Sequence, residues 1–122
     1  MKKKRILLID DDSRNIFALT AVLRARGFVC LSCLSAPEAL QLLREGAQVD
    51  AILIDMMMPE MDGYEAIPRI RALDLGKRVP ILAVTAQAMV GDREKCLRAG
   101  ADAYISKPID VDQLLAELDA VP

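Results

Sequence analysis

Short apolar runs alternate with longer amphipathic stretches five times along the chain. Residues 6–9, 51–54 and 81–84 are apolar at every position, which is typical of strands buried on both faces. Residues 29–34 and 103–106 are weaker strand candidates. Strands and helices that alternate in this way favour a parallel sheet with helices on both of its faces.

The stretches between the strands have the periodicity of helices. Ile16 begins a largely apolar set at i, i+3, i+4 and i+7, and this helix is predicted to stop at Gly27, a residue suited to a left-handed helix end. Asp110 is placed to open the last helix, where residues 111–118 repeat the same spacing. Residues 89–99 are predicted to form the fourth helix.

Side chains that can cap a helix precede the second and third helices. Ser35 and Glu38 have the spacing of a capping box, and Asp62 and Glu65 repeat it. Pro68 breaks the pattern of the third helix, because it donates no backbone hydrogen bond and its ring crowds the preceding turn. We therefore expect the third helix to be kinked or to start late.

Length and composition fit one domain. The chain has 122 residues, of which 53% are hydrophobic and 28% charged, a globular profile with an aliphatic core. Connections are short and no linker or repeat interrupts the pattern, so residues 1–122 are predicted to form a single domain. The formal net charge is −2, and the basic run at residues 2–5 is not continued by a basic stripe, so we expect no nucleic-acid binding. No apolar run approaches a membrane span, and the protein is predicted to be cytoplasmic, without membrane contact.

The chain has no histidine, which excludes mixed cysteine–histidine zinc sites and histidine-dependent nucleophilic triads. Three cysteines remain, Cys30, Cys33 and Cys96. Cys30 and Cys33 are three positions apart on a predicted strand, where side chains at this spacing point to opposite faces. We therefore expect ordinary buried thiols rather than a redox or metal site.

Polar side chains follow four of the predicted strands: Asp10, Asp11 and Asp12 after the first, Asp55 after the third, Thr85 after the fourth and Lys107 after the fifth. The carboxyl ends of parallel strands meet at one edge of the sheet, which is where ligands bind. Carboxylates brought together there repel one another unless a cation compensates their charge. Mg²⁺ fits, since it prefers oxygen ligands and bridges carboxylates to phosphate.

This set of side chains is suited to phosphoryl transfer. Asp55 is predicted to be the nucleophile, because carboxylates can form aspartyl-phosphates and an ionised carboxylate needs no general base. Asp11 and Asp12 are predicted to hold the metal, although Asp12 alone also fits a solvated turn or a helix cap. Lys107 and Thr85 are predicted to donate hydrogen bonds to phosphoryl oxygens.

Four segments resemble, in order and spacing, the motifs of receiver domains from bacterial response regulators and hybrid sensor kinases, and the likeness covers essentially the whole chain. They are residues 9–12 with the acidic pair, 55–63 with the phosphoacceptor, 84–86 with the switch threonine, and 99–108 with the switch aromatic Tyr104 and the lysine. Residues 82–96 look more like receivers attached to hybrid kinases than those fused to DNA-binding domains.

The resemblance implies a single flavodoxin-like (βα)₅ domain with a parallel sheet of order 2-1-3-4-5. It implies Mg²⁺ or Mn²⁺ as cofactor, with these ligands: Asp11, Asp12, Asp55 and the backbone carbonyl of Met57. Asp10 would then be the last residue of the first strand, an acid that the motif does not require. The bond that precedes Pro108 would be cis, which only the family resemblance suggests.

The resemblance also implies what the protein does. It would accept a phosphoryl group from a histidine kinase or a histidine phosphotransfer protein, acting as a signalling domain and not as an enzyme with external turnover. Thr85 and Tyr104 would switch the surface formed by residues 89–99, 103–106 and 110–118, through which self-association is also expected. The chain fits a single-domain regulator and a piece of a longer protein alike.

Two other functions compete with this interpretation. Residues 10–12 contain the Asp-x-Asp of haloacid dehalogenase-type phosphatases, but those enzymes place the nucleophile after the first strand and the metal-binding acids late in the chain. An adaptor that works without phosphorylation is the second alternative. Such a protein has no need to keep Asp55, Thr85 and Lys107 together, and this chain has all three.

Overall fold

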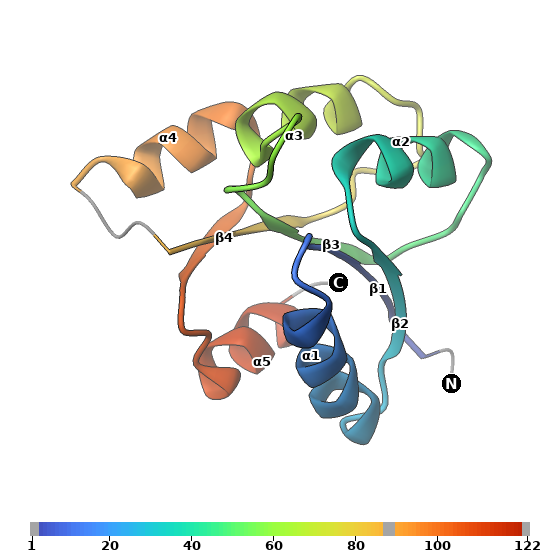
Figure 1. Ribbon diagram of the computed structural model, residues 1–122. Helices are drawn as coiled ribbons and strands as arrows, with labels where there is room; N and C mark the ends of the chain where they lie inside the picture. Colours follow the sequence, from blue (N-terminus) through green and yellow to red (C-terminus); the bar gives the residue numbers. More distant parts are fainter. Residues whose placement is uncertain (1–2, 87–89, 121–122) are drawn as a thin grey trace.

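The computed structural model describes residues 3–86 and 90–120, and strands and helices alternate through these ranges as predicted (Figure 1). The strands are β1 (Arg5–Ile9), β2 (Val29–Cys33), β3 (Ala51–Asp55), β4 (Ile81–Thr85) and β5 (Ala103–Ser106). The helices are α1 (Ser13–Ala25), α2 (Ala36–Arg44), α3 (Gly63–Arg71), α4 (Asp92–Ala99) and α5 (Val111–Asp119).

All neighbouring strands pair in parallel, in the order β2-β1-β3-β4-β5, which confirms the predicted fold class and strand order. Helices α1 and α5 cover one face of the sheet, and α2, α3 and α4 cover the other (Figure 1). Along residues 3–86 and 90–120, no helix is long and apolar enough to cross a membrane.

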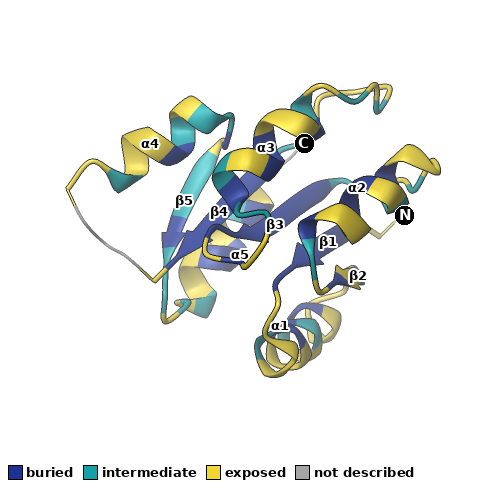
Figure 2. Ribbon diagram, turned by 45° about the horizontal axis from the view of Figure 1, so that its top comes forward, coloured by how far each residue is buried: buried dark blue, intermediate teal, exposed yellow. Residues whose placement is uncertain are grey.

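The sheet separates two apolar cores, and this explains why residues 6–9, 51–54 and 81–84 are apolar at every position. Side chains alternate between the faces of a strand, so Leu7 and Ile9 pack under α2 and α3, whereas Ile6 and Leu8 pack against α1 and α5. The central strands are accordingly buried along their whole length (Figure 2). Each fully buried Leu or Ile side chain stabilises the fold by roughly 1.5–3 kcal/mol.

The cysteines divide between these two cores. Cys30 packs on the side of α1 and α5 and Cys33 on the opposite side, which confirms that their side chains point to different faces of β2. All three cysteines are free, and burial raises the pKa of the Cys33 thiol to about 11.

Polar side chains begin several helices as the sequence predicts. The Ser35 hydroxyl accepts a hydrogen bond from the Glu38 N–H, and the Asp62 carboxylate accepts one from the Glu65 N–H. The other half of the first box differs, because the Glu38 carboxylate accepts from the N–H of Leu34 instead of that of Ser35.

Helix α4 starts later than predicted, and α3 does not start late. Helix α3 begins directly after its cap, so Pro68 within it does not delay the start, and the kink stays a prediction. Helix α4 begins at Asp92 behind Gly91, whose φ of 91° lies in the left-handed region that glycine tolerates. The predicted start at residue 89 lies outside the described residues.

Candidate functional site

The register of the sheet brings two acidic segments together. Strands β1 and β3 are adjacent and parallel, with Ile9 opposite Ile54. The next residues along these strands are Asp10 and Asp55, so their side chains emerge next to each other at the carboxyl edge of the sheet. Both are buried, with 5% of each residue exposed.

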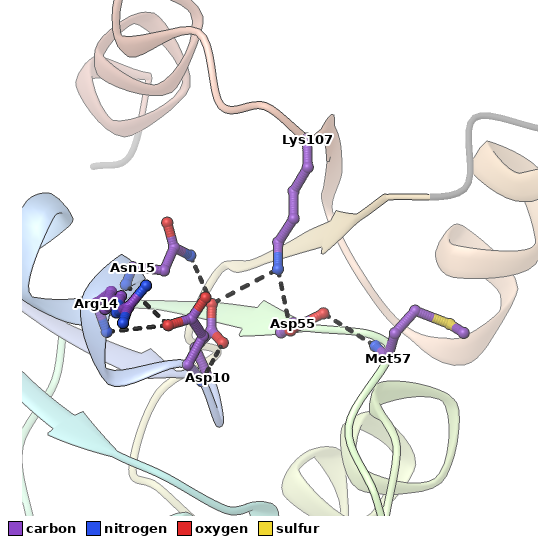
Figure 3. Close-up of polar contacts among 7 residues, drawn as sticks. Asp10, Arg14, Asn15, Asp55, Met57 and Lys107 are labelled. Carbon is purple, nitrogen blue, oxygen red and sulfur yellow. Dashed lines mark hydrogen bonds and ion pairs between the residues drawn. The ribbon is translucent and has the colours of Figure 1, made fainter.

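Asp55 is held by one backbone donor and one side-chain donor. Its Oδ1 accepts a hydrogen bond of 3.0 Å from the backbone N–H of Met57, and its Oδ2 accepts one of 3.1 Å from Lys107 Nζ (Figure 3). Burial raises the pKa of the Asp55 carboxyl, and the charge of Asp10 adds to this, while the two hydrogen bonds lower it. Asp55 is therefore a desolvated carboxylate whose negative charge depends on nearby donors.

Lys107 reaches this carboxylate from the end of β5. Its backbone N–H donates to the carbonyl of Thr85 at 2.8 Å, and the Lys107–Pro108 peptide bond is cis, as the resemblance implied. Burial alone would lower the pKa of the Lys107 ammonium, but the hydrogen bond to Asp55 and the charges of Asp10, Asp55 and Asp12 raise it. The ammonium therefore stays protonated at neutral pH and also lies 3.8 Å from Asp10.

Three carboxylates converge beside Lys107. Asp10, Asp11 and Asp55 each place one carboxylate oxygen so that the three atoms lie within 4.8 Å of one another. This differs from the sequence prediction, which paired Asp11 with Asp12. The carboxylate of Asp12 instead accepts hydrogen bonds from the N–H groups of Arg14 and Asn15 and caps α1.

The capping role explains why Asp12 is not one of the converging acids. Asp12 immediately precedes the first residue of α1, where a side-chain oxygen satisfies backbone N–H groups that have no partner within the helix. The sequence contained this signal, because an aspartate directly before an apolar helical pattern is a cap candidate. The two acids after β1 whose carboxylates converge with that of Asp55 are therefore Asp10 and Asp11.

Asn15 is a site residue that the sequence analysis missed. Its side-chain amide donates a hydrogen bond of 2.6 Å to Oδ2 of Asp10, while the backbone N–H of Asp12 donates one of 2.9 Å to Oδ1 (Figure 3). No local pattern singles out an asparagine in the first turn of a helix, since this contact depends on how α1 packs against β1.

Thr85 and Tyr104 lie on one face of the sheet. Ala83 of β4 is opposite Tyr104 of β5, and alternation along β4 puts the Thr85 side chain on the same face as Ala83. Thr85 is buried, whereas Tyr104 is partly buried and packs against the core under α3 and α4. Burial, Asp92 and Cys96 raise the pKa of the Tyr104 hydroxyl. The switching role of these two residues stays a prediction.

The donor set fits a hard divalent cation. All three converging ligands are carboxylates, and one ammonium does not balance three negative charges. Oxygen ligands with room for water on the exposed side of Asp11 suit Mg²⁺ or Mn²⁺. Met57 donates its N–H to Asp55, and the role of its carbonyl as a further ligand stays a prediction.

Comparisons with known proteins show which family the chain resembles. The family model of the response regulator receiver domain matches residues 6–119. The chain is 33% identical to Histidine kinase 3 of Arabidopsis thaliana, over 94% of the chain and 13% of that much longer protein. It is 35% identical to the polar-differentiation response regulator DivK of Brucella anthropi, over 92% of the chain and 90% of DivK.

A solved structure resembles the chain closely. The receiver domain of a sensor histidine kinase from Pseudomonas aeruginosa is 39% identical and superposes with a TM-score of 0.86, over 97% of this chain and 96% of that one. That structure has a magnesium ion coordinated in its active site cleft.

Proposed function

Because the chain belongs to the response regulator receiver domain family of two-component signalling, we propose that it accepts a phosphoryl group on Asp55. One observation carries this proposal. The buried Asp55 carboxylate lies at the end of a central strand, 3.1 Å from the Lys107 ammonium and within 4.8 Å of carboxylate oxygens of Asp10 and Asp11. A nucleophile, a cation and two metal-ligating acids thus share one edge of the sheet.

The proposed reaction needs no general base. An oxygen of the Asp55 carboxylate attacks the phosphorus of a phosphohistidine, the P–N bond breaks, and the electron pair of that bond returns to the imidazole nitrogen. The donor imidazole then carries no phosphate and Asp55 carries an acyl phosphate. Lys107 remains charged throughout and is placed to hydrogen-bond a phosphoryl oxygen in place of Asp55 Oδ2.

Asp10, Asp11 and Asp55 are the residues proposed to hold Mg²⁺ or Mn²⁺. When bound, the cation supplies positive charge for the phosphoryl oxygens. The fold keeps the three carboxylates close together, and those of Asp10 and Asp55 are shielded from water. This strengthens their attraction for a cation. The relative from Pseudomonas aeruginosa, with magnesium in its cleft, supports this choice of metal.

The proposed partners are of the two-component kind. The relatives include a histidine kinase and the response regulator DivK, so we expect a histidine kinase or a histidine phosphotransfer protein as the phosphoryl donor. We expect the domain to work in the cytoplasm and to turn over only its own phosphate. The surface of α4, β5 and α5 is proposed to report the phosphorylated state and to be available for self-association.

Acetyl phosphate separates this function from a phosphatase. With Mg²⁺ present, a receiver is expected to take up at most one phosphoryl group per chain and to release phosphate only as fast as that group hydrolyses. Excess chelator is expected to stop the labelling. The Asp10→Ala, Asp11→Ala double variant is expected not to be labelled. Rapid repeated hydrolysis of a generic phosphate ester, or full labelling in chelator, would reject the proposal.

A further inference from the structure

Asn15 makes the shortest of the hydrogen bonds described at the acidic site. Its Nδ2 lies 2.6 Å from Oδ2 of Asp10, in the range of a charge-assisted hydrogen bond (Figure 3). The residue is half-buried on the first turn of α1, the turn that Asp12 caps. Its position is therefore fixed by the start of the helix.

The two oxygens of Asp10 have different donors. Oδ1 accepts from the backbone N–H of Asp12 at 2.9 Å, and Oδ2 accepts from Asn15. With both oxygens held, the plane of the Asp10 carboxylate cannot rotate without losing a hydrogen bond. The orientation that results is the one in which Asp10, Asp11 and Asp55 converge.

Asn15 holds this carboxylate without neutralising it. Lys107 also lies near Asp10, but its ammonium is 3.8 Å from Asp10 and closer, at 3.1 Å, to Asp55. A neutral amide leaves the full negative charge of Asp10 available to a cation. A lysine or arginine at position 15 would instead neutralise that charge.

The volume beside Asn15 is also limited. A cavity of about 10 Å³ lies beneath the site, lined by Asp10, Asn15 and Asp55 together with apolar side chains such as Leu19 and Ile109. This is roughly the volume that one water needs. A smaller residue at position 15 would enlarge this space next to both carboxylates and would free Asp10 to turn.

We propose that Asn15 is a positioning residue for the cation site, which fixes the Asp10 carboxylate in its metal-binding orientation. The inference rests on the proposed function, because it takes Asp10, Asp11 and Asp55 as the ligands. Residues that hydrogen-bond a metal ligand commonly change metal affinity by about 10- to 100-fold when they are replaced. The site here is partly open to water, so about tenfold is expected.

The test measures Mg²⁺ affinity of the unphosphorylated protein by NMR titration. Asn15→Leu keeps the approximate size and removes the donor, and Asn15→Ala removes both. Ser13→Ala, an exposed change on the same helical turn, is the matched control. Both Asn15 variants are expected to bind Mg²⁺ about tenfold more weakly, whereas Ser13→Ala binds as the unchanged protein does.

A kinetic measurement distinguishes positioning from a general loss of structure. In labelling with acetyl phosphate, the Mg²⁺ concentration for half-maximal rate is expected to rise in the Asn15 variants by about the same factor, while the rate at saturating Mg²⁺ stays within about twofold. If Asn15→Leu does not fold, the Mg²⁺ affinity and labelling rate of Asn15→Ala test the inference instead.

Three outcomes distinguish the role of Asn15 from the proposed cation site itself. Weaker binding in the Asn15 variants, with binding also lost in Asp10→Asn, supports the inference. Unchanged Mg²⁺ affinity in folded Asn15 variants, while Asp10→Asn loses binding, overturns the role of Asn15 and leaves the proposed function intact. Mg²⁺ binding that survives Asp11→Asn and Asp55→Asn rejects the site itself, and the inference with it.

Discussion

Gly63 is the residue at which side-chain volume is most tightly restricted. It is buried at the first position of α3, and its N–H donates to the carbonyl of Met56 at 3.1 Å. A Cβ at this position would lie 2.9 Å from the Met56 Cα and would overlap the Met56 side chain. Since backbone cannot move aside as a flexible side chain can, the helix would have to shift away from the end of β3, next to Asp55.

We predict that Gly63→Ala lowers the free energy of unfolding by about 1–3 kcal/mol, the usual cost of forcing extra atoms into a packed site. Urea denaturation monitored by circular dichroism measures this. Ser13→Ala is the matched control, because Ser13 also follows an aspartate cap at the first position of a helix but is exposed. Equal stability of the two variants would show that the contact with Met56 relaxes without cost.

The residues of the site differ in how far the sequence alone predicted them. Asp55 and Lys107 follow buried strands, and a parallel sheet necessarily brings such residues to one edge. The choice among Asp10, Asp11 and Asp12 was not settled by that rule, because it depends on which carboxylate turns back to cap α1. Contacts such as Asn15 with Asp10 depend on the packing of a helix on a strand, which no local pattern encodes.

Elements far apart in the sequence are tied together at the opposite end of the sheet. The Arg71 guanidinium, at the end of α3, donates to the carbonyls of Gly100 and Val79 and to the Asp102 carboxylate at 2.7 Å. Asp102 also accepts from the N–H of Ile81 at 2.9 Å. This network joins α3, the start of β4 and the loop between α4 and β5.

Asp102 makes the stability of this junction depend on pH. Burial opposes ionisation, but the hydrogen bonds from Ile81 and Arg78 and the charge of Arg71 outweigh it and lower the pKa of the Asp102 carboxyl below its ordinary 3.8. A carboxyl with a lower pKa in the folded state stabilises the fold above its unfolded pKa. That contribution is lost as the pH falls below about 4, through the folded-state pKa.

We predict that Asp102→Asn lowers the free energy of unfolding at pH 7 by about 1–3 kcal/mol, because an amide cannot accept from all of these donors. The difference between the variant and the unchanged protein should shrink as the pH falls below about 4. Urea denaturation of both proteins between pH 7 and pH values below about 4 measures this difference in the free energy of unfolding. Glu65→Gln, which affects an exposed pair with Arg69, is the control and should change stability by less than about 0.5 kcal/mol. A pH-independent difference would contradict the electrostatic explanation.

The alternating pattern predicted the elements better than it predicted their ends. Residues 6–9 and 51–54 are apolar throughout because each strand is covered on both faces, so the pattern and the packing have the same cause. The start of α4 differs because Gly91 acts as its cap in a left-handed conformation, which sequence periodicity does not report. Pro68 is accommodated inside α3, where Ala72 still donates to its carbonyl.

At the scale of the whole molecule, the proposed signal must travel from Asp55 to the surface of α4, β5 and α5. Thr85 and Tyr104 share one face of the sheet, and Tyr104 packs against the core under α4. A threonine that turns toward a phosphoryl oxygen would leave space on this face that the Tyr104 ring can enter. The protein can shift toward the conformation with Thr85 turned only as far as the phosphoryl group binds that conformation more tightly than the original one.

We predict that beryllofluoride, which stands in for the phosphoryl group on Asp55, changes the NMR spectrum around Thr85, Tyr104 and α4. In Thr85→Ala the changes at Tyr104 are expected to shrink, while those next to Asp55 persist. Thr20→Ala, a change of the same chemistry on α1, is the control and should leave both sets of changes in place. An undiminished response of Tyr104 and α4 in Thr85→Ala would contradict the coupling and leave the phosphorylation site standing.

The identity of the phosphorylated residue is tested most directly by intact-mass measurement after incubation with acetyl phosphate and Mg²⁺. The unchanged protein is expected to gain one phosphoryl group and Asp55→Asn none. Asp12→Asn, which alters a neighbouring acid that caps α1, is expected to keep the gain. Undiminished labelling of Asp55→Asn would contradict the assignment of Asp55 as the phosphoacceptor.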